Sequence, residues 1–342
     1  MKKYDVYGVG NALMDIIIDA NPNLLEELKL KKGQMQLIDK IQSRLILEKI
    51  KLIDMKEIPG GSAANTISGI NSLGGKVAFC GKVGDDKQGE LYVKRMVEEG
   101  VSSNIKKDEE STGHAITFIT PDTERTFATF LGAAVNLKKE DINEDELVNS
   151  RILHLEGYMF EGSNKESALH AIEIARRNDV KVSIDLADPG FVERNLDELK
   201  KIVKGSHIIF ANEEEAKMFT GKEGEEALNE LSRYSKIAIV KLGSEGSFIR
   251  EDDTVYRIKG IKVNAVDTTG AGDMYAACVL YGMTNGLDLQ KSGELASFTA
   301  AQVVTQIGAR LLSFGKVLEK LNSLKNGQDR IEGHEASTLK DR

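Results

Sequence analysis

The chain has 342 residues, of which 41% are hydrophobic and 29% are charged, so it can bury the core of one large globular domain. Its 46 basic and 54 acidic residues leave a net charge of −8, which argues against nucleic acid as a partner of the whole protein. The two cysteines, Cys80 and Cys278, lack metal-ligand spacing, and no apolar run is long enough to cross a membrane, so we expect a cytoplasmic protein with free, buried thiols.

From the N-terminus onward, short β-branched runs alternate with longer amphipathic segments. Helical patterns, such as those at residues 63–73 and 165–178, separate the expected strands. This alternation is typical of a parallel sheet covered by helices on both faces. It predicts one doubly wound, mostly parallel α/β domain over residues 1–325. The expected strands are residues 4–10, 77–81, 152–156, 182–185, 208–212 and 237–241.

Two stretches, at about residues 11–39 and 112–132, interrupt the alternation. The second stretch alternates apolar and polar residues on both sides of a Pro-Asp-Thr-Glu turn at 121–124, which predicts a β-hairpin. We expect strands from both stretches to form a small β-sheet that stands over one edge of the main domain as a lid. The polar tail at residues 326–342 is expected to be disordered.

The segment most specific for chemistry is Asp-Thr-Thr-Gly-Ala-Gly-Asp at residues 267–273, followed by an apolar helical run. Glycines before a helix let successive backbone N–H groups point at one spot, and the helix N-terminus adds partial positive charge. Such a turn suits a transferring phosphoryl group, and Asp273 beside it could accept the proton of an attacking hydroxyl. In the alternative interpretation, Asp273 only caps the helix and Gly270 and Gly272 only shape the turn.

A second glycine-rich segment, Gly-Gly-Ser-Ala-Ala-Asn at residues 60–65, opens a predicted helix, and Gly-Lys-Val-Gly-Asp-Asp-Lys-Gln-Gly follows at 81–89. With residues 267–273, in this order and at this separation, the chain resembles the ribokinase or PfkB-type carbohydrate and nucleoside kinase family. The resemblance extends from residue 4 to about residue 314. It implies a ribokinase-like fold, the use of ATP and magnesium, and transfer of the γ-phosphoryl group to a hydroxyl of a sugar or nucleoside.

The resemblance also implies roles for single residues. Asp273 would be the catalytic base, and the backbone amides of Gly270, Ala271 and Gly272 would form the anion hole. The residues that would hold the hydroxyls of the acceptor are Asn11, Asp15, Gly60, Gly61 and Asn65. A carboxylate and an amide suit a vicinal diol, and glycine permits its close approach. For Asp15 considered alone, a plain turn residue is the alternative.

On the donor side, the resemblance assigns Asn212 and Glu215 to the magnesium-bound phosphates, with Glu215 acting through water. An acidic helix N-terminus that offsets the helix dipole is the alternative. Lys241, Gly243 and Gly246 resemble the ATP-binding turn of the family, although an ordinary strand-to-strand turn would have similar residues.

Asp267 is a separate case. Some members of the family hold a monovalent cation such as potassium with an aspartate at this position and with carbonyls of a later loop, here around Gly308. The alternative is that Asp267 orders its own Thr268-Thr269 turn.

Residues 10–15, 32–37 and 125–134 resemble the adenosine kinase-like branch. A nucleoside base needs flat apolar walls, for which Leu13, Met35 and Phe130 are candidates, and Arg125 could reach a phosphate from the lid. The alternatives are packing between lid and body for the apolar residues and a solvated position for Arg125.

We therefore expect a nucleoside acceptor, adenosine first, phosphorylated at its 5′-hydroxyl. The segments expected to line the acceptor pocket, residues 10–15, 34–38 and 60–65, contain no lysine or arginine, which argues against a sugar phosphate. A free sugar such as ribose or fructose is the first alternative, and a non-catalytic ligand-binding relative is the second. Both a monomer and a homodimer fit the sequence.

Overall fold

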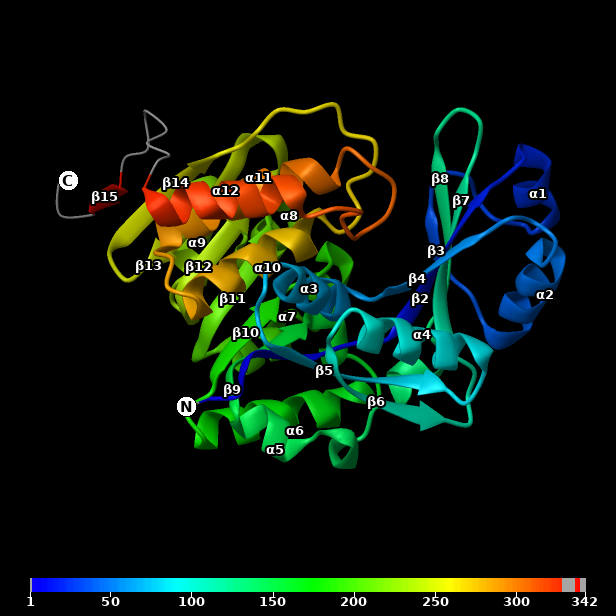
Figure 1. Cartoon of the computed structure of the whole chain (residues 1–342), viewed down its shortest axis with the longest axis horizontal. Coiled ribbons are helices and arrows are strands. Elements are labelled where there is room, and N and C mark those ends of the chain that lie inside the picture. Colours follow the sequence, from blue (N-terminus) through cyan, green and yellow to red (C-terminus); the bar gives the residue numbers. More distant parts are fainter. Residues whose placement is uncertain (1, 328–335, 339–342) are drawn as a thin grey trace.

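The computed structural model describes residues 2–327 and 336–338. It consists of a large α/β body and a smaller sheet that stands beside it, with two short helices on its outer side (Figure 1). The other residues of the predicted polar tail, 328–335 and 339–342, lie outside the described part of the chain.

The body contains the following elements. Its strands are β1 (Tyr4–Val9), β5 (Val77–Gly84), β6 (Ser102–Asp108), β9 (Ser150–Glu156), β10 (Lys181–Asp185), β11 (Ser206–Asn212), β12 (Ser235–Lys241), β13 (Gly246–Glu251), β14 (Thr254–Lys259) and β15 (Ala336–Thr338). Its helices are α3 (Ser62–Ser72), α4 (Lys87–Glu98), α5 (Glu144–Val148), α6 (Asn164–Arg177), α7 (Pro189–Val203), α8 (Glu213–Thr220), α9 (Gly224–Leu231), α10 (Ala271–Thr284), α11 (Leu289–Val303) and α12 (Gly315–Asn326).

The smaller sheet and its helices form the lid. Its elements are β2 (Leu13–Asp19), α1 (Pro22–Glu27), β3 (Met35–Leu37), α2 (Lys40–Ile50), β4 (Lys56–Gly60), β7 (Gly113–Ile119) and β8 (Arg125–Phe130).

Among the described residues, ten strands form the main sheet in the order β15-β14-β13-β12-β11-β10-β9-β1-β5-β6. The strands from β12 to β6 pair in parallel, and β13, β14 and β15 continue the sheet in antiparallel pairs. The predicted doubly wound, mostly parallel sheet with a smaller second sheet is thus confirmed.

Strand β11 illustrates why the central strands are continuous apolar runs. Ile208 and Phe210 pack toward the face covered by α3, α10, α11 and α12, whereas Ile209 and Ala211 pack toward the face covered by α6 to α9. All four side chains are fully buried. Because helices cover both faces of the sheet, its central strands need an apolar side chain at nearly every position.

The lid sheet has the order β3-β8-β7-β2-β4. On β2, Met14, Ile16 and Ile18 are buried and belong to the core formed with the two lid helices. Because side chains alternate along a strand, the intervening residues of β2 point to the other face of this sheet, toward the body. Ile17, for example, lies next to Gly308 of the body.

The lid is larger than the sequence predicts. The hairpin of β7 and β8 is antiparallel about the expected turn, but β4 adds an edge strand beyond residue 39, and α1 and α2 occupy residues between the lid strands. The sequence of β4, Lys-Glu-Ile-Pro-Gly, contains Pro59. Proline is tolerated in an edge strand, but it argues against a strand when the sequence is considered alone. At the other end of the chain, residues 336–338 of the predicted tail pair with β14 as β15.

No helix in the described residues combines the length and apolar character that spanning a membrane would require.

Candidate active site

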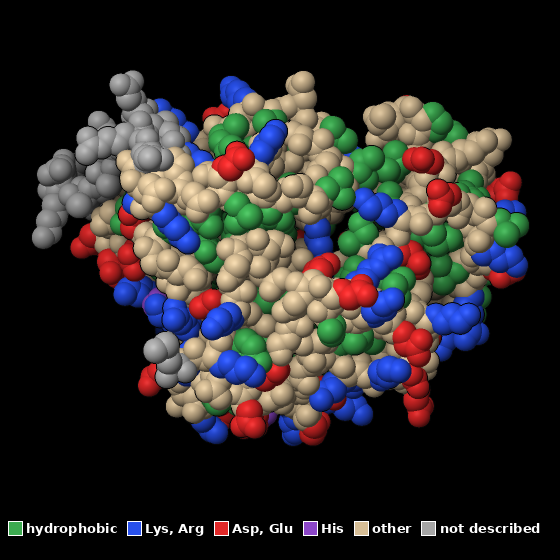
Figure 2. Space-filling model, viewed as in Figure 1, with side chains coloured by type: hydrophobic (Ala, Val, Ile, Leu, Met, Phe, Trp, Pro, Cys, Tyr) green, Lys and Arg blue, Asp and Glu red, His purple; other side chains and the backbone are tan. Residues whose placement is uncertain are grey.

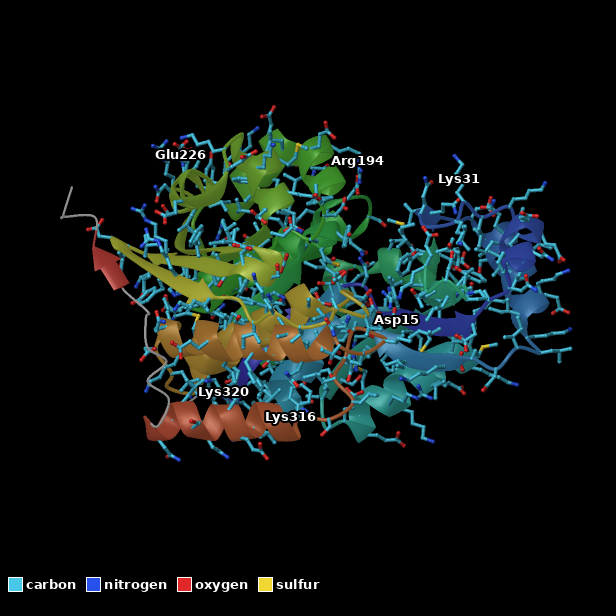
Figure 3. The ribbon with its side chains drawn as sticks, turned by 90° about the horizontal axis from the view of Figure 1, so that it is seen from above. Asp15, Lys31, Arg194, Glu226, Lys316 and Lys320 are labelled. Atoms are coloured by element: carbon cyan, nitrogen blue, oxygen red, sulfur yellow. The ribbon has the colours of Figure 1, made fainter. Side chains whose placement is uncertain are left out.

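The parallel strands end at one edge of the main sheet, and neighbouring strand ends carry polar side chains there. Asn11 follows β1, and Glu156, Asp185, Asn212 and Lys241 are the last residues of β9, β10, β11 and β12. In open α/β sheets the crevice at these carboxyl ends is the usual ligand site. A hollow between body and lid is visible in Figure 2, and Asp15 lies where the lid meets the body in Figure 3.

The glycine turn before α10 has the geometry expected from its sequence. Gly270 precedes the helix with φ 77°, and a side chain at this position would collide with the carbonyl of Ala309. Only glycine adopts this conformation readily and fits this space. The first N–H groups of α10 have no partners within the helix, and that of Ala271 donates to the carbonyl of Thr268 at 3.2 Å. A helix N-terminus of this kind can bind an anion.

Asp273 lies in the first turn of α10 and is partly buried. Ser62 Oγ donates to Asp273 Oδ1 at 2.7 Å, and Asn65 Nδ2 donates to Oδ2 at 3.0 Å. Burial raises the pKa of the Asp273 carboxyl to about 6, although both hydrogen bonds oppose the shift. The group therefore stays mostly ionised at neutral pH but is more basic than an ordinary aspartate, as a general base requires.

Arg310, in the loop after α11, fixes the orientation of the Asn65 amide. Its Nε donates to Asn65 Oδ1 at 2.9 Å, and its Nη1 lies 2.9 and 2.8 Å from the two carboxylate oxygens of Glu99. The Arg310 side chain is only 10% exposed. Because Asn65 Oδ1 accepts from the guanidinium, the amide must present its NH₂ group to Asp273.

Asp15 and Asn11 lie beside this group of residues. Burial raises the pKa of the Asp15 carboxyl to about 7, the Asp273 and Asp267 carboxylates add to the shift, and Arg310 opposes it. Gly61 has φ 95°, and a side chain there would collide with the carbonyl of Asn11. The chain after β1 and the start of α3 thus approach each other as closely as glycine allows.

Glu156 holds these two segments together. It is 1% exposed, and it accepts the N–H of Asn11 at 2.9 Å through Oε1 and the N–H of Ala63 at 2.7 Å through Oε2. Burial raises the pKa of Glu156 to about 7, against the effect of the two backbone hydrogen bonds. One buried carboxylate therefore sets the distance between Asn11 and the helix that carries Asn65.

Phe130 lies on the opposite face of the lid sheet from that expected. Its ring stands 5.5 Å from that of His114, which hydrogen-bonds Ser43 of α2 at 3.2 Å. The structure therefore contradicts the expectation that Phe130 is a wall of the acceptor pocket. Side chains alternate along β8, so Phe127 instead faces the body. Met35 pairs with Phe127 on the neighbouring strand and is 58% exposed.

Arg125 of the lid contacts the start of the glycine turn. Its Nη1 lies 3.0 Å from Asp267 Oδ1, and its Nη2 donates to the carbonyl of Val266 at 2.6 Å. Asp267 also accepts the N–H groups of Thr269 and Gly308, each at 2.9 Å. Asp267 therefore orders its own turn and pairs with the Arg125 guanidinium. The negative charge of Asp267 is already compensated, so we assign no step to such a cation.

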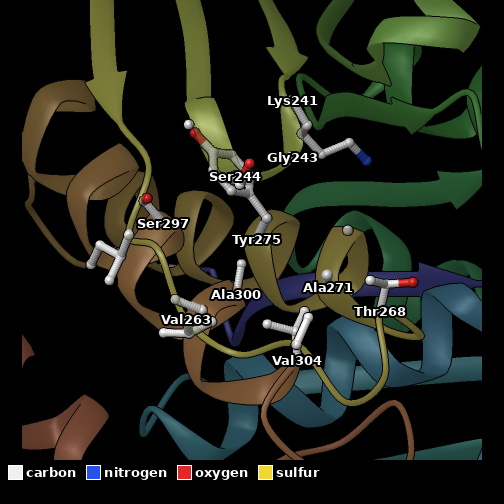
Figure 4. A pocket seen from close by; sticks show the side chains of 15 residues that line it. Lys241, Gly243, Ser244, Val263, Thr268, Ala271, Tyr275, Ser297, Ala300 and Val304 are labelled. Atoms are coloured by element: carbon white, nitrogen blue, oxygen red, sulfur yellow. The ribbon is translucent and has the colours of Figure 1, made fainter. Parts of the chain in front are cut away.

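A largely apolar cavity of about 270 Å³ lies on the other side of the glycine turn, between the β12–β13 turn and α10 and α11 (Figure 4). Lys241 and Gly272 line it at the crevice, so it opens directly onto the turn. Gly243 and Gly246, which the sequence predicts to belong to an ATP-binding turn, also line it. The other lining residues include Ser244, Val263, Tyr275, Ala300 and Val304.

Asn212 and Glu215 form a capping box at the start of α8. Glu215 Oε2 accepts the N–H of Asn212 at 2.8 Å, Oε1 accepts from Asn212 Nδ2 at 2.6 Å, and Asn212 Oδ1 accepts the N–H of Glu215 at 2.8 Å. Both residues thus have a structural role at the helix N-terminus, which the alternative of an acidic N-terminus that offsets the helix dipole had in part anticipated. Burial raises the pKa of Glu215, while the nearby Lys241 opposes the shift.

A family model described as pfkB family carbohydrate kinase matches residues 35–313. The chain belongs to this family. An uncharacterized sugar kinase from Archaeoglobus fulgidus is 30% identical over 246 residues, which cover 71% of this chain and 96% of that protein. A 5-dehydro-2-deoxygluconokinase from Clostridium perfringens is 33% identical over 262 residues, which cover 72% of this chain and 78% of that protein.

Solved structures agree with this assignment. The structure of adenosine kinase from Sinorhizobium meliloti is 34% identical, with a TM-score of 0.83, and the match covers 94% of this chain and 99% of that one. A probable sugar kinase from Rhizobium etli is 33% identical, with a TM-score of 0.84 and coverage of 96% and 100%. The resemblance seen in the sequence is confirmed, and the PfkB kinase is a phosphotransferase with a hydroxyl acceptor.

In this kinase, the structure brings Asp273, Asn65, Asp15, Asn11 and the glycine turn together, as the sequence suggested. Sequence reasoning missed several residues of the site. Glu156 and Asp185 could have been found, because they end predicted strands at the edge where ligands bind. Ser62 lies within residues 60–65, the glycine-rich segment that carries part of the family resemblance. Arg310 has no local signal, since 245 residues separate it from its partner Asn65.

We predict that Asp273→Asn lowers kcat by roughly a hundredfold or more while the protein remains folded, because the amide cannot accept the hydroxyl proton. In the wild type, kcat/KM should fall as the pH drops below about 6, where Asp273 becomes protonated. Steady-state rates from pH 5 to 8 and thermal melts of both proteins measure these effects. Asp253→Asn, at an exposed turn, is the matched control. Near-normal turnover by Asp273→Asn would refute the assignment.

Arg310→Met should raise the acceptor KM at least about fivefold, because it frees the Asn65 amide to turn. The lost positive charge also raises the pKa of Asp15, so the acid limb of the acceptor pH profile should move to higher pH. Arg194→Met removes an exposed arginine paired with Glu161 and serves as the control. An unchanged acceptor KM and an unchanged pH profile would mean that Arg310 does not position Asn65.

Proposed function

We propose that this PfkB kinase is ATP-dependent and phosphorylates the 5′-hydroxyl of a nucleoside, with adenosine as the preferred acceptor. The observation that carries this proposal is a set of apolar side chains on the face of the lid sheet that also carries Asp15, Thr117 and Thr129. Leu13 and Ile17 flank Asp15 on β2, and Phe127 extends this face two strands away. If a sugar binds at Asp15, the group attached to its anomeric carbon would contact these side chains.

The residues around Asp273 support a direct phosphoryl transfer. Bound ATP with magnesium would supply the γ-phosphoryl group and part of the charge neutralisation. Asp273 accepts the proton of the attacking hydroxyl as the new O–P bond forms and the bond to ADP breaks. The backbone N–H groups of Gly270, Ala271 and Gly272 bind the negative charge on the transferring oxygens.

The donor side has the features that a nucleotide needs. The cavity of about 270 Å³ offers apolar walls to a base and leads to the glycine turn, where phosphates would bind. The described residues contain no cluster of three or more His, Cys, Asp or Glu side chains suited to hold a metal ion. Magnesium would therefore share its ligands with the phosphates, as this ion usually does, and Glu215 would act on it through water.

The acceptor side favours a nucleoside over a free sugar. Asp15, Gly61 and Asn65 suit a ribose diol, and the base would then lie against Leu13 and Phe127. A free pentose would leave this apolar surface in water. Because some relatives are sugar kinases, a free sugar remains the alternative acceptor. The presence of Asp273 and the glycine turn argues against the other alternative, a non-catalytic relative.

We predict that ADP release is fastest with adenosine in a panel of adenosine, inosine, guanosine, cytidine, ribose and fructose. The physical reason is the burial of the base under the lid. Initial rates at several acceptor concentrations give kcat/KM for each compound. A larger kcat/KM for ribose or fructose than for every nucleoside would replace the proposal with a sugar kinase.

Phe127→Ala should raise the KM for adenosine about tenfold, a loss of ~1.4 kcal/mol, and affect ribose little. Phe130→Leu is the matched control, because this phenylalanine of the same strand packs on the other face. Its KM for adenosine should stay within twofold of the wild type. Equal effects of the two substitutions, or an equal effect of Phe127→Ala on ribose, would contradict a base bound at Phe127.

A further inference from the structure

Asn164 is a buried amide at the end of α6 that lies nearest the crevice. It is the first residue of this helix and is 1% exposed. Helix α6 comes after β9 in the chain, so its first turn lies at the edge of the main sheet where the parallel strands end. Because water does not reach the amide, it has to find its hydrogen-bond partners within the protein.

The partners of Asn164 lie on two segments that connect the body to the lid. Its Nδ2 donates to Asn11 Oδ1 at 3.0 Å and to the carbonyl of Ala134 at 2.9 Å. Its Oδ1 accepts the N–H of Leu137 at 2.9 Å. Asn11 lies just before β2, where the chain enters the lid, and Ala134 and Leu137 follow β8, where the chain leaves it. One side chain of the body therefore holds both segments.

These contacts fix which way the Asn11 amide points. Its oxygen accepts from Asn164, so its NH₂ group lies at the other end of the amide. Burial raises the pKa of Glu156 to about 7, and a hydrogen bond from the Asn11 side chain is among the contacts that oppose this shift. An ionised carboxylate only accepts hydrogen bonds, so this bond uses one N–H of the Asn11 amide. The second N–H is what the amide can offer to a bound molecule.

We propose that Asn164 is a positioning residue for the acceptor, because it holds the Asn11 amide with its NH₂ group available to an oxygen of the acceptor. Asn164 does not touch the acceptor itself. Without it, the Asn11 amide is free to turn over and to present its oxygen, whose lone pairs repel those of the acceptor oxygen. The proposal rests on the proposed function through the acceptor contact of Asn11, but not on whether the acceptor is a nucleoside or a sugar.

The first test is Asn164→Ser, whose side chain is too short to reach Asn11. With the best acceptor of the panel above, the acceptor KM should rise at least about fivefold, while kcat and the KM for ATP stay within about twofold of the wild type. Asn178→Ser is the matched control, because it removes an amide that donates to the carbonyl of Ile174 at the other end of α6. Its acceptor KM should not change. An unchanged acceptor KM in Asn164→Ser, or an equal rise in the KM for ATP, would overturn the role.

A double-mutant cycle tests whether Asn164 acts through Asn11. Asn11→Ala removes the amide that Asn164 holds and should itself raise the acceptor KM. Adding Asn164→Ser to this variant should change the acceptor KM by less than about twofold, because the two side chains act as one unit. A further rise as large as that in the wild-type background would mean that Asn164 does not act through Asn11. An unchanged acceptor KM in Asn11→Ala would refute the acceptor contact, and the proposal with it.

Asn164→Ser also leaves the carbonyl of Ala134 and the N–H of Leu137 without partners, and this can unfold the protein. Asn164→Asp keeps the size of the side chain and still accepts the N–H of Leu137, but its carboxylate cannot donate to Asn11. Thermal melts show which variant is folded, and either one should raise the acceptor KM alone. A folded Asn164→Asp protein with the wild-type acceptor KM would refute the proposal. A wild-type protein that phosphorylates neither nucleosides nor sugars would instead refute the proposed function, on which the proposal rests.

Discussion

The site depends on the burial of several carboxylates in one crevice, where the parallel strands end. Burial raises the pKa values of Asp15, Glu156 and Asp273, because a carboxylate is poorly solvated there and neighbouring negative charges repel one another. Hydrogen-bond donors stabilise the ionised forms of Glu156 and Asp273. Glu156 receives two backbone N–H groups, and Asp273 receives Ser62 and Asn65. These donors come from distant parts of the chain, so the fold itself sets the basicity of Asp273, the proposed base.

Side chains on the lid strands alternate between the core under the lid helices and the crevice. On β2, Ile16 belongs to the core under the lid helices and its neighbour Asp15 faces the crevice. On β8, Ala128 is buried on the helix side, whereas Arg125 reaches Asp267 at the start of the glycine turn. The lid sheet therefore carries Asp15, a proposed acceptor contact, and touches the start of the glycine turn as one unit. A movement of the lid would change the distance of Asp15 from Asp273 and the contact of Arg125 together.

The sequence predicts those parts of the protein whose signals are local. The turn at residues 267–273 is contiguous, and the strands that end at Glu156, Asp185, Asn212 and Lys241 are apolar runs with polar ends. Contacts between distant residues leave no such signal, so the role of Arg310 in orienting Asn65 appears only in the structure. The error at Phe130 is one of phase. A strand pattern shows that two faces exist, but not which face the body covers. Phe127 and Phe130 are three residues apart on β8 and therefore lie on opposite faces.

The balance of charge in the crevice also bears on the acceptor. The sequence offered no basic residue near the acceptor segments, yet Arg310 contacts Asn65 and Arg125 contacts Asp267. Both guanidinium groups are already paired, Arg310 with Glu99 and Arg125 with Asp267. An anionic group on the acceptor would thus meet Asp15 and Asp273 without a free cation from either arginine. At 4 Å such a repulsion costs about 4 kcal/mol in a partly solvated site. This cost favours a neutral acceptor, whose hydroxyls can donate to the carboxylates, and it supports a nucleoside more strongly than a sugar phosphate or a sugar acid.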